Sequence, residues 1–138
     1  MKRTLRITIC LVLIFALVSS SVAYALTESN AYISSWNGAV SVANDGTVTV
    51  NFGTHGTGRM DKIGASAISV YENGQFKKFF SATNPLYTAT MMGTNDYDFY
   101  GYASFTGTKG KTYQALITFY AEKDGGSGVE YMWTDIAS

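Results

Sequence analysis

Apolar and polar residues alternate with a period of two along most of this chain, in short runs separated by glycine-rich turns. A period of two places successive side chains on opposite faces of a β-strand, whereas an amphipathic helix has a period of about 3.6 residues. No helical pattern of useful length stands out. The runs that predict strands are residues 39–43, 47–52, 66–72, 75–80, 97–105, 111–122 and 129–136.

Two further segments have weaker strand character. Residues 32–36 precede Asn37-Gly38 and predict a first strand that is split from the run after it. Residues 86–92 follow Pro85, the only proline, and predict a seventh or eighth strand. Asn73-Gly74 favours a type I′ hairpin turn, because both central residues of that turn need a positive φ.

The alternation predicts the core as well as the strands. The inward-facing side chains would be Val48, Val50, Phe52, Ile68, Val70, Tyr113, Ala115, Ile117, Phe119 and Ala121. Strands without intervening helices predict antiparallel pairing, and a chain of this length suits one sandwich with sheets about 10 Å apart. The predicted fold is therefore an all-β, antiparallel two-sheet sandwich of about seven strands.

The first 25 residues predict a secretory signal peptide. Lys2, Arg3 and Arg6 form a basic start, residues 7–18 are almost wholly apolar, and Ala23-Tyr24-Ala25 matches a cleavage site. The apolar run is shorter than a membrane span of roughly 20 residues, so an uncleaved membrane anchor is the less favoured alternative. Cleavage would release residues 26–138 as a single secreted, extracellular domain that has no membrane attachment.

Charge and cysteine content narrow the classes of function. The signal peptide holds three of the ten basic residues and no acid, so residues 26–138 carry seven basic residues against ten acidic ones. A mildly acidic domain without a basic cluster is a poor candidate for nucleic-acid binding. The only cysteine, Cys10, lies in the signal peptide, so the domain has no disulfide and no thiolate metal site. We expect no cofactor and no metal.

Residues 110–121, GKTYQALITFYA, place a tyrosine between a turn and an alternating strand. This segment resembles the corner and sixth strand of immunoglobulin-like and fibronectin type III domains. The resemblance implies that the Tyr113 hydroxyl bonds to backbone a few residues upstream, and that Phe52 takes the place of a large aromatic on the second strand. The cysteine pair of true immunoglobulin domains is absent. Residues 56–72 are also similar to small secreted proteins of Gram-positive bacteria with no assigned activity.

Several glycines between residues 53 and 64 raise the question of a phosphate-binding loop. Such a loop follows a strand and leads into a helix whose free N–H groups face the phosphate. Residues 59–64 have the length of about one helical turn, and no Lys-Ser or Lys-Thr pair accompanies them. We interpret the segment as a crossover between the two sheets, with Met60 and Ile63 covering one end of the core.

The sequence predicts no catalytic residues, and we expect no enzyme. His55 is the only histidine, and no G-x-S-x-G nucleophile motif accompanies it, so we interpret it as a solvated loop side chain. Asp96 and Asp98 lie two residues apart, but Ca²⁺ takes about six to eight oxygen ligands. We interpret these two aspartates as a solvated pair at the start of a strand.

Aromatic residues on the outward phase of the strands are the candidates for binding. If Ile117 and Phe119 face the core, and Met132 and Ile136 do on the last strand, their sequence neighbours face solvent. The predicted ligand-binding side chains are Tyr71, Tyr120, Tyr131 and Trp133. Exposed aromatic rings stack on sugars or anchor protein partners. The competing interpretation is that these residues only suit strands, or that a loop covers them.

The leading hypothesis is a secreted, non-catalytic binding module that recognises a polysaccharide or an extracellular protein through this aromatic face. The first alternative is a structural or self-associating matrix protein whose edge strands supply the contacts. A small secreted toxin or bacteriocin-like protein is a further alternative. The sequence leaves the oligomeric state open.

Overall fold

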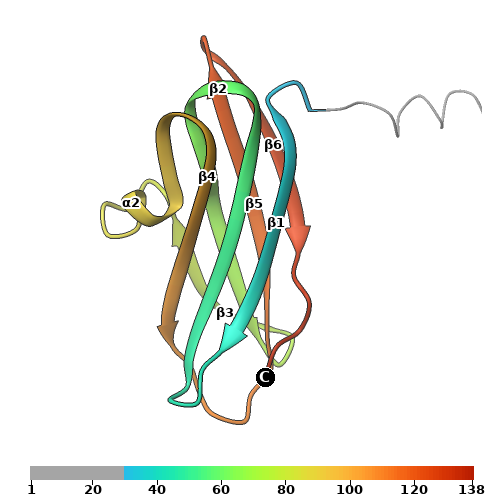
Figure 1. Cartoon of the computed structure of the whole chain (residues 1–138). Helices are drawn as coiled ribbons and strands as arrows, with labels where there is room; N and C mark the ends of the chain where they lie inside the picture. Colours follow the sequence, from blue (N-terminus) through green and yellow to red (C-terminus); the bar gives the residue numbers. More distant parts are fainter. Residues whose placement is uncertain (1–29) are drawn as a thin grey trace, which may run out of the picture.

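The computed structural model describes residues 30–138, which form one six-stranded antiparallel sheet with a single short helix in this part of the chain (Figure 1). The elements are β1 (Ile33–Val42), β2 (Thr47–Glu72), β3 (Gln75–Ser81), α2 (Thr88–Met91), β4 (Met92–Thr106), β5 (Tyr113–Lys123) and β6 (Gly126–Trp133). The all-β prediction is confirmed. The predicted signal peptide, residues 1–25, lies outside the described residues, and within them no helix has the length and apolar character of a membrane span.

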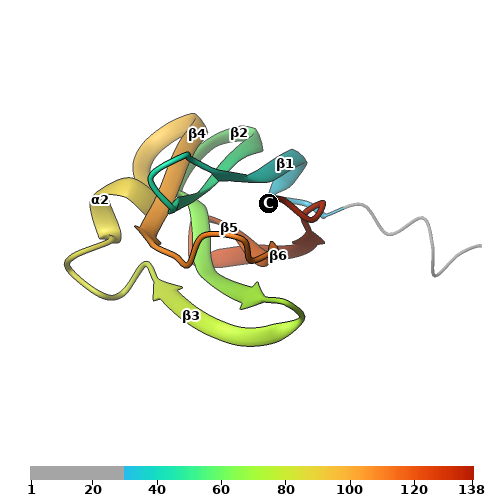
Figure 2. The same ribbon diagram turned by 90° about the horizontal axis from the view of Figure 1, so that it is seen from below.

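Strand β2 organises the sheet because it pairs with four other strands. Its first half lies between β1 and β4, with Val50 opposite Val40 on one side and Ala103 on the other. Its second half lies between β3 and β5, with Ile68 opposite Phe80 and Ile117. Strand β6 continues the sheet beyond β5. The hydrogen bonds thus join all the strands in one sheet that curls, as the end-on view shows (Figure 2), rather than in two separate sheets.

Residues 56–64 carry β2 from one half of the curled sheet to the other. The segment stays extended, so the helical turn considered for residues 59–64 is absent. Gly64 pairs with both Met92 and Tyr120, and a Cβ added to it would overlap the Met91 carbonyl oxygen. The buried Thr54 hydroxyl donates to the Gly64 carbonyl over 3.0 Å and so ties the two halves of β2 together.

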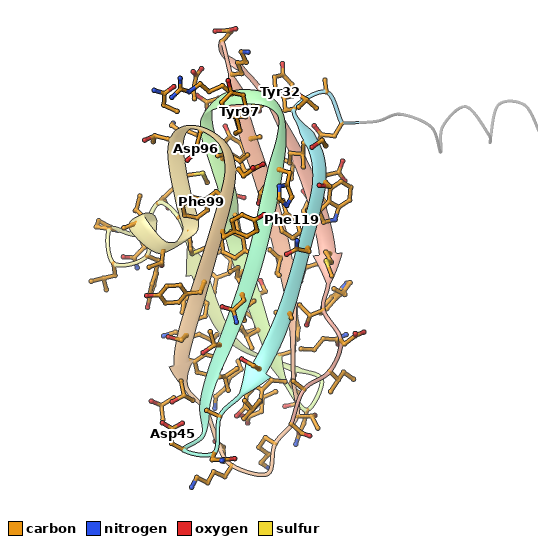
Figure 3. All side chains as sticks on the ribbon, in the orientation of Figure 1. Tyr32, Asp45, Asp96, Tyr97, Phe99 and Phe119 are labelled. Carbon is orange, nitrogen blue, oxygen red and sulfur yellow. The ribbon has the colours of Figure 1, made fainter. Side chains whose placement is uncertain are left out.

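The core lies inside the curve of the sheet, and the inward-facing residues predicted between Val48 and Ala121 are all buried. Ile136, also expected to face inward, is 67% exposed because β6 ends at Trp133. Phe119, which is labelled in Figure 3, meets the ring of Phe52 edge-on at a centroid distance of 6.4 Å. The Trp36 ring packs against Phe119 at 6.3 Å. Met60 and Ile63 are also buried, as expected for residues that cover one end of the core. The period-two alternation therefore identified the inner face correctly.

The buried Tyr113 side chain connects the start of β5 to the segment that precedes it. Its hydroxyl accepts a hydrogen bond from the Thr108 N–H at 2.6 Å and donates one to the Glu72 carboxylate at 2.7 Å. Burial raises the pKa of Tyr113 above its ordinary value of 10.0, and the bond to Glu72 raises it further. The hydroxyl thus links the loop before β5 to the end of β2.

Two element predictions need correction. Strand β1 is continuous through Asn37-Gly38. A side chain at residue 38 would overlap the Ile117 side chain, so glycine suits this position within the strand. Residues 86–91 form a turn and helix α2 rather than a strand, and Met92 begins β4. There the Thr88 hydroxyl donates to the Ala82 and Asn84 carbonyls, while Met91 is buried. The Asn73-Gly74 turn has the expected positive φ at both residues, 48° and 80°.

Candidate binding faces

The four predicted binding aromatics differ in exposure. Trp133 and Tyr131, both on β6, are 51% and 65% exposed, whereas Tyr71 and Tyr120 are half-buried. Met132, between the two β6 aromatics, packs against the core. The outer face of β6 therefore presents its aromatic rings to solvent.

Three of the four belong to one cluster. The Tyr71 ring lies 5.1 Å from the Trp133 ring and meets Phe76 edge-on at 6.0 Å. Leu116 lies opposite Trp133 and Ser69, and Ser69 lies opposite Phe79. Tyr131 is the next outward residue on β6. We call this surface the aromatic face; its members are Tyr71, Phe76, Phe79, Leu116, Tyr131 and Trp133.

Phe76 and Phe79 are members of this face that sequence reasoning missed. Phe80 is buried, so strict alternation along β3 places Phe79 on the outer face. The sequence alone could therefore have predicted the outward position of Phe79. The same alternation turns Phe76 inward, but it is exposed. The cause is the shift of register between Val70 and Tyr71, which places Phe76 opposite Tyr71. A bulge of this kind has no clear mark in the sequence.

Tyr120 lies apart from the cluster. It pairs with Val129 and Gly64, four positions along β5 from the residue opposite Trp133. Its hydroxyl donates to Glu122 at 2.6 Å, and this bond, together with burial, raises the pKa of Tyr120. The ring lines a cavity of about 440 Å³ with Met92, Ala82 and five polar side chains: Lys62, Ser66, Thr83, Thr88 and Thr94. The four predicted binding aromatics therefore do not form one surface, because Tyr120 lies outside the cluster.

The opposite outer face, over β1, the first half of β2, and β4, carries a second set of aromatic rings that sequence reasoning did not select. Tyr100 and Tyr102 on β4 are 69% and 50% exposed. Asn37 and Gly53 lie in register with Tyr100, and Ala39 and Asn51 lie in register with Tyr102. A groove of about 450 Å³ is lined by Asn37, Gly38, Ala39, Asn51, Phe52, Tyr100, Gly101 and Tyr102. We call it the tyrosine groove.

His55 supports one side of this groove, and its interpretation as a solvated loop residue was wrong. It lies within β2, where its Nδ1 is 2.9 Å from Asp98 Oδ1. The Tyr100 hydroxyl is 3.4 Å from His55 Nε2, and the two rings meet edge-on at 5.4 Å. A carboxylate at Nδ1 favours the tautomer with its proton on Nδ1, which leaves Nε2 to accept from Tyr100.

Asp96 and Asp98 do not act as a pair. Asp96 accepts a hydrogen bond from the Tyr97 N–H, while Asp98 binds His55. Across residues 30–138, no group of three or more His, Cys, Asp or Glu side chains is arranged to hold a metal ion.

No family model, curated protein or solved structure matches the chain, so comparison with known proteins gives no relative from which to transfer a role.

Proposed function

We propose that this protein is a secreted, non-catalytic binding module whose aromatic face docks on an apolar surface of an extracellular protein. One observation carries the proposal: the Tyr71 ring contacts both Trp133 and Phe76 on the outside of the sheet, with Trp133 half-exposed. Exposed apolar groups that form a contiguous patch are typical of interaction sites, whereas scattered ones need no explanation.

The composition of the face favours a protein partner over a sugar. Phe76, Phe79 and Leu116 carry no hydrogen-bonding groups, and a sugar ring needs such groups around its hydroxyls. Trp and Tyr at the centre of a desolvated patch are the usual energetic anchors of protein interfaces. Charged groups lie at the border, where Lys77 Nζ is 3.8 Å from Glu72 Oε2. An apolar centre with a charged border is the common anatomy of such interfaces.

We also propose that the curled sheet is a variant of the immunoglobulin-like or fibronectin type III sandwich. The support is the Tyr113 corner, whose hydroxyl bonds to Thr108 five residues upstream. The antiparallel order is consistent with that family, and the shared strand β2 is the feature that departs from two separate sheets.

Self-association is the second candidate function, and the free edges of the sheet favour it. Within the described residues, β1 pairs only with β2 and β6 pairs only with β5. Each therefore leaves one row of backbone groups without a strand partner, and such edges can add a strand from another copy. Sedimentation velocity across a wide concentration range tests this candidate, because edge pairing makes the sedimentation coefficient rise with concentration.

The decisive experiment measures partner binding by Trp133→Ala. Immobilised protein (residues 26–138) is incubated with extracellular proteins and, separately, with insoluble polysaccharides, and affinity is then measured for whatever is retained. We expect a retained protein to bind Trp133→Ala at least about 30-fold more weakly, the effect of losing about 2 kcal/mol at an interface anchor.

Tyr97→Ala is the matched control. Tyr97 is an exposed aromatic near the end of the molecule opposite Asp45 (Figure 3), away from the aromatic face, and it should keep full affinity. Equal affinity of Trp133→Ala and Tyr97→Ala would refute the proposal. Retention of a polysaccharide alone, lost in Trp133→Ala, would assign the aromatic face to sugars instead.

A further inference from the structure

The tyrosine groove has the chemistry of a second binding site, on the outer face of the other half of the curled sheet from the aromatic face. We propose that it binds a neutral sugar ring of a polysaccharide. The proposal does not depend on the aromatic face or its partner, because the two surfaces share no residue and lie over different halves of β2, the groove beside β1 and β4 and the aromatic face beside β3, β5 and β6.

The groove offers both kinds of contact that a sugar requires. Tyr100 and Tyr102 expose their rings, and aromatic rings stack on the apolar C–H face of a pyranose. The exposed amides of Asn37 and Asn51 line the same groove from neighbouring strands. An amide donates and accepts at once, which matches hydroxyl groups that also do both. Stacking and amide contacts can therefore act on one ring.

The lining residues also indicate an uncharged ligand. Asparagine, glycine, alanine, phenylalanine and tyrosine are the only residue types that line the groove. The neighbouring Asp98 carboxylate is engaged by His55. With no lysine or arginine in the lining, the groove lacks the cation that would compensate a uronate or a phosphate. We therefore assign it to a neutral glycan rather than an anionic one.

Tyr100 is held in place before any ligand arrives. A Cβ added to Gly53 would lie 3.0 Å from the Cδ1 and Cε1 atoms of Tyr100, so the ring packs closely on the backbone at residue 53. His55 supports the same ring edge-on and bonds its hydroxyl, and Asp98 holds His55. A ring that is already ordered loses little conformational entropy on binding.

The test is affinity electrophoresis of the protein (residues 26–138) in gels that contain one soluble glycan each. The neutral glycans are mixed-linkage β-glucan, xyloglucan, galactomannan, mannan and amylose, and polygalacturonate is the anionic comparison. We expect at least one neutral glycan to retard the protein and polygalacturonate not to. Tyr100→Ala should weaken the retardation roughly tenfold or more, and Tyr100→Phe should keep most of it because the ring remains.

Two further variants separate the groove from the rest of the molecule. Asn51→Leu, which keeps the side-chain size but removes the amide, should also weaken retardation, while Trp133→Ala should not change it. Denaturation midpoints close to that of the parent protein confirm that each variant is folded. Failure of every neutral glycan to retard the protein overturns the proposal, as does retardation by polygalacturonate alone. Retardation that Trp133→Ala abolishes and Tyr100→Ala leaves intact would place the glycan site on the aromatic face.

Discussion

The aromatic face and the tyrosine groove expose rings to a similar degree on the outer faces of the two halves of one curled sheet, but their neighbours differ. Around Trp133 the neighbouring side chains are Tyr71 and Leu116, and Phe76 lies next to Tyr71. Around Tyr100 they are Asn37 and His55. Apolar neighbours favour removal of a whole surface from water, whereas amides favour directed hydrogen bonds. Exposure alone thus identifies outward positions, and the surrounding residues indicate the ligand chemistry.

Both faces are built on the same core, and a substitution in that core should have the largest effect on the free energy of unfolding. Phe119→Ala should reduce the free energy of unfolding by about 3–5 kcal/mol, because a buried aromatic that contacts Phe52 and Trp36 leaves a cavity. Phe79→Ala, on the exposed phase of β3, should change it by less than about 1 kcal/mol. Urea denaturation measures both. A similar loss for the two variants would contradict the assignment of inner and outer phases.

Gly64 couples the two halves of the sheet, and its substitution should have the next largest effect. Gly64→Ala should cost about 1–3 kcal/mol, because the new Cβ overlaps the backbone at Met91 and the φ of 156° disfavours a side chain. Gly58→Ala is the control in the same strand, since the nearest atom to its added Cβ is Lys123 Nζ at 4.0 Å. Thermal unfolding compares the two; equal midpoints would contradict the described close approach.

Tyr113 is buried, in contrast to the exposed tyrosines of the two faces. Tyr113→Phe should cost about 1 kcal/mol through loss of its hydrogen bonds to Thr108 and Glu72. Its raised pKa also predicts a pH dependence: the stabilisation is complete below pH 10.0, the ordinary value, and falls as pH rises through the folded-state pKa. Urea denaturation between about pH 8 and pH 11 should show a shallower alkaline decline in the variant.

The smallest expected effect on the free energy of unfolding comes from removing the central ring of each face. Trp133→Ala and Tyr100→Ala should each change the free energy of unfolding by less than about 1 kcal/mol, because both side chains are at least half-exposed. The double variant should show the sum of the two changes, since the residues share no contact partner. A double-mutant cycle by urea denaturation checks this. A coupling energy above about 0.5 kcal/mol would show that the faces are not independent.

Much of the fold was readable in the sequence because burial imposes a period of two on a strand with one face to the core. Val48, Val50, Ile117 and Phe119 are buried as that period requires. The Asn73-Gly74 turn was readable because few residue pairs tolerate two positive φ values. These features are local or strictly periodic, so a single sequence contains them.

What the sequence did not reveal depends on pairing between distant residues. The outward position of Phe76 comes from a register shift against β2, and the support of Tyr100 by His55 joins residues 45 positions apart. Helix α2 replaced a predicted strand because its turn is closed by bonds from Thr88 to the Ala82 and Asn84 carbonyls. The tyrosine groove needs three strands side by side, and no alternation within one strand predicts that.

Strand β2, with 26 residues, has a consequence for the order of folding. Its two ends each form a hairpin with the adjacent strand, β1 at one end and β3 at the other, and such local pairings close small loops and form quickly. Strands β4 and β5 can dock only after this template exists, and they bridge much longer stretches of chain. We expect the two hairpins to appear early and the slow step to be the arrival of β4 and β5. A chain cleaved between residues 56 and 64 would then yield two fragments that each hold half of the β2 template, and neither would complete the sheet.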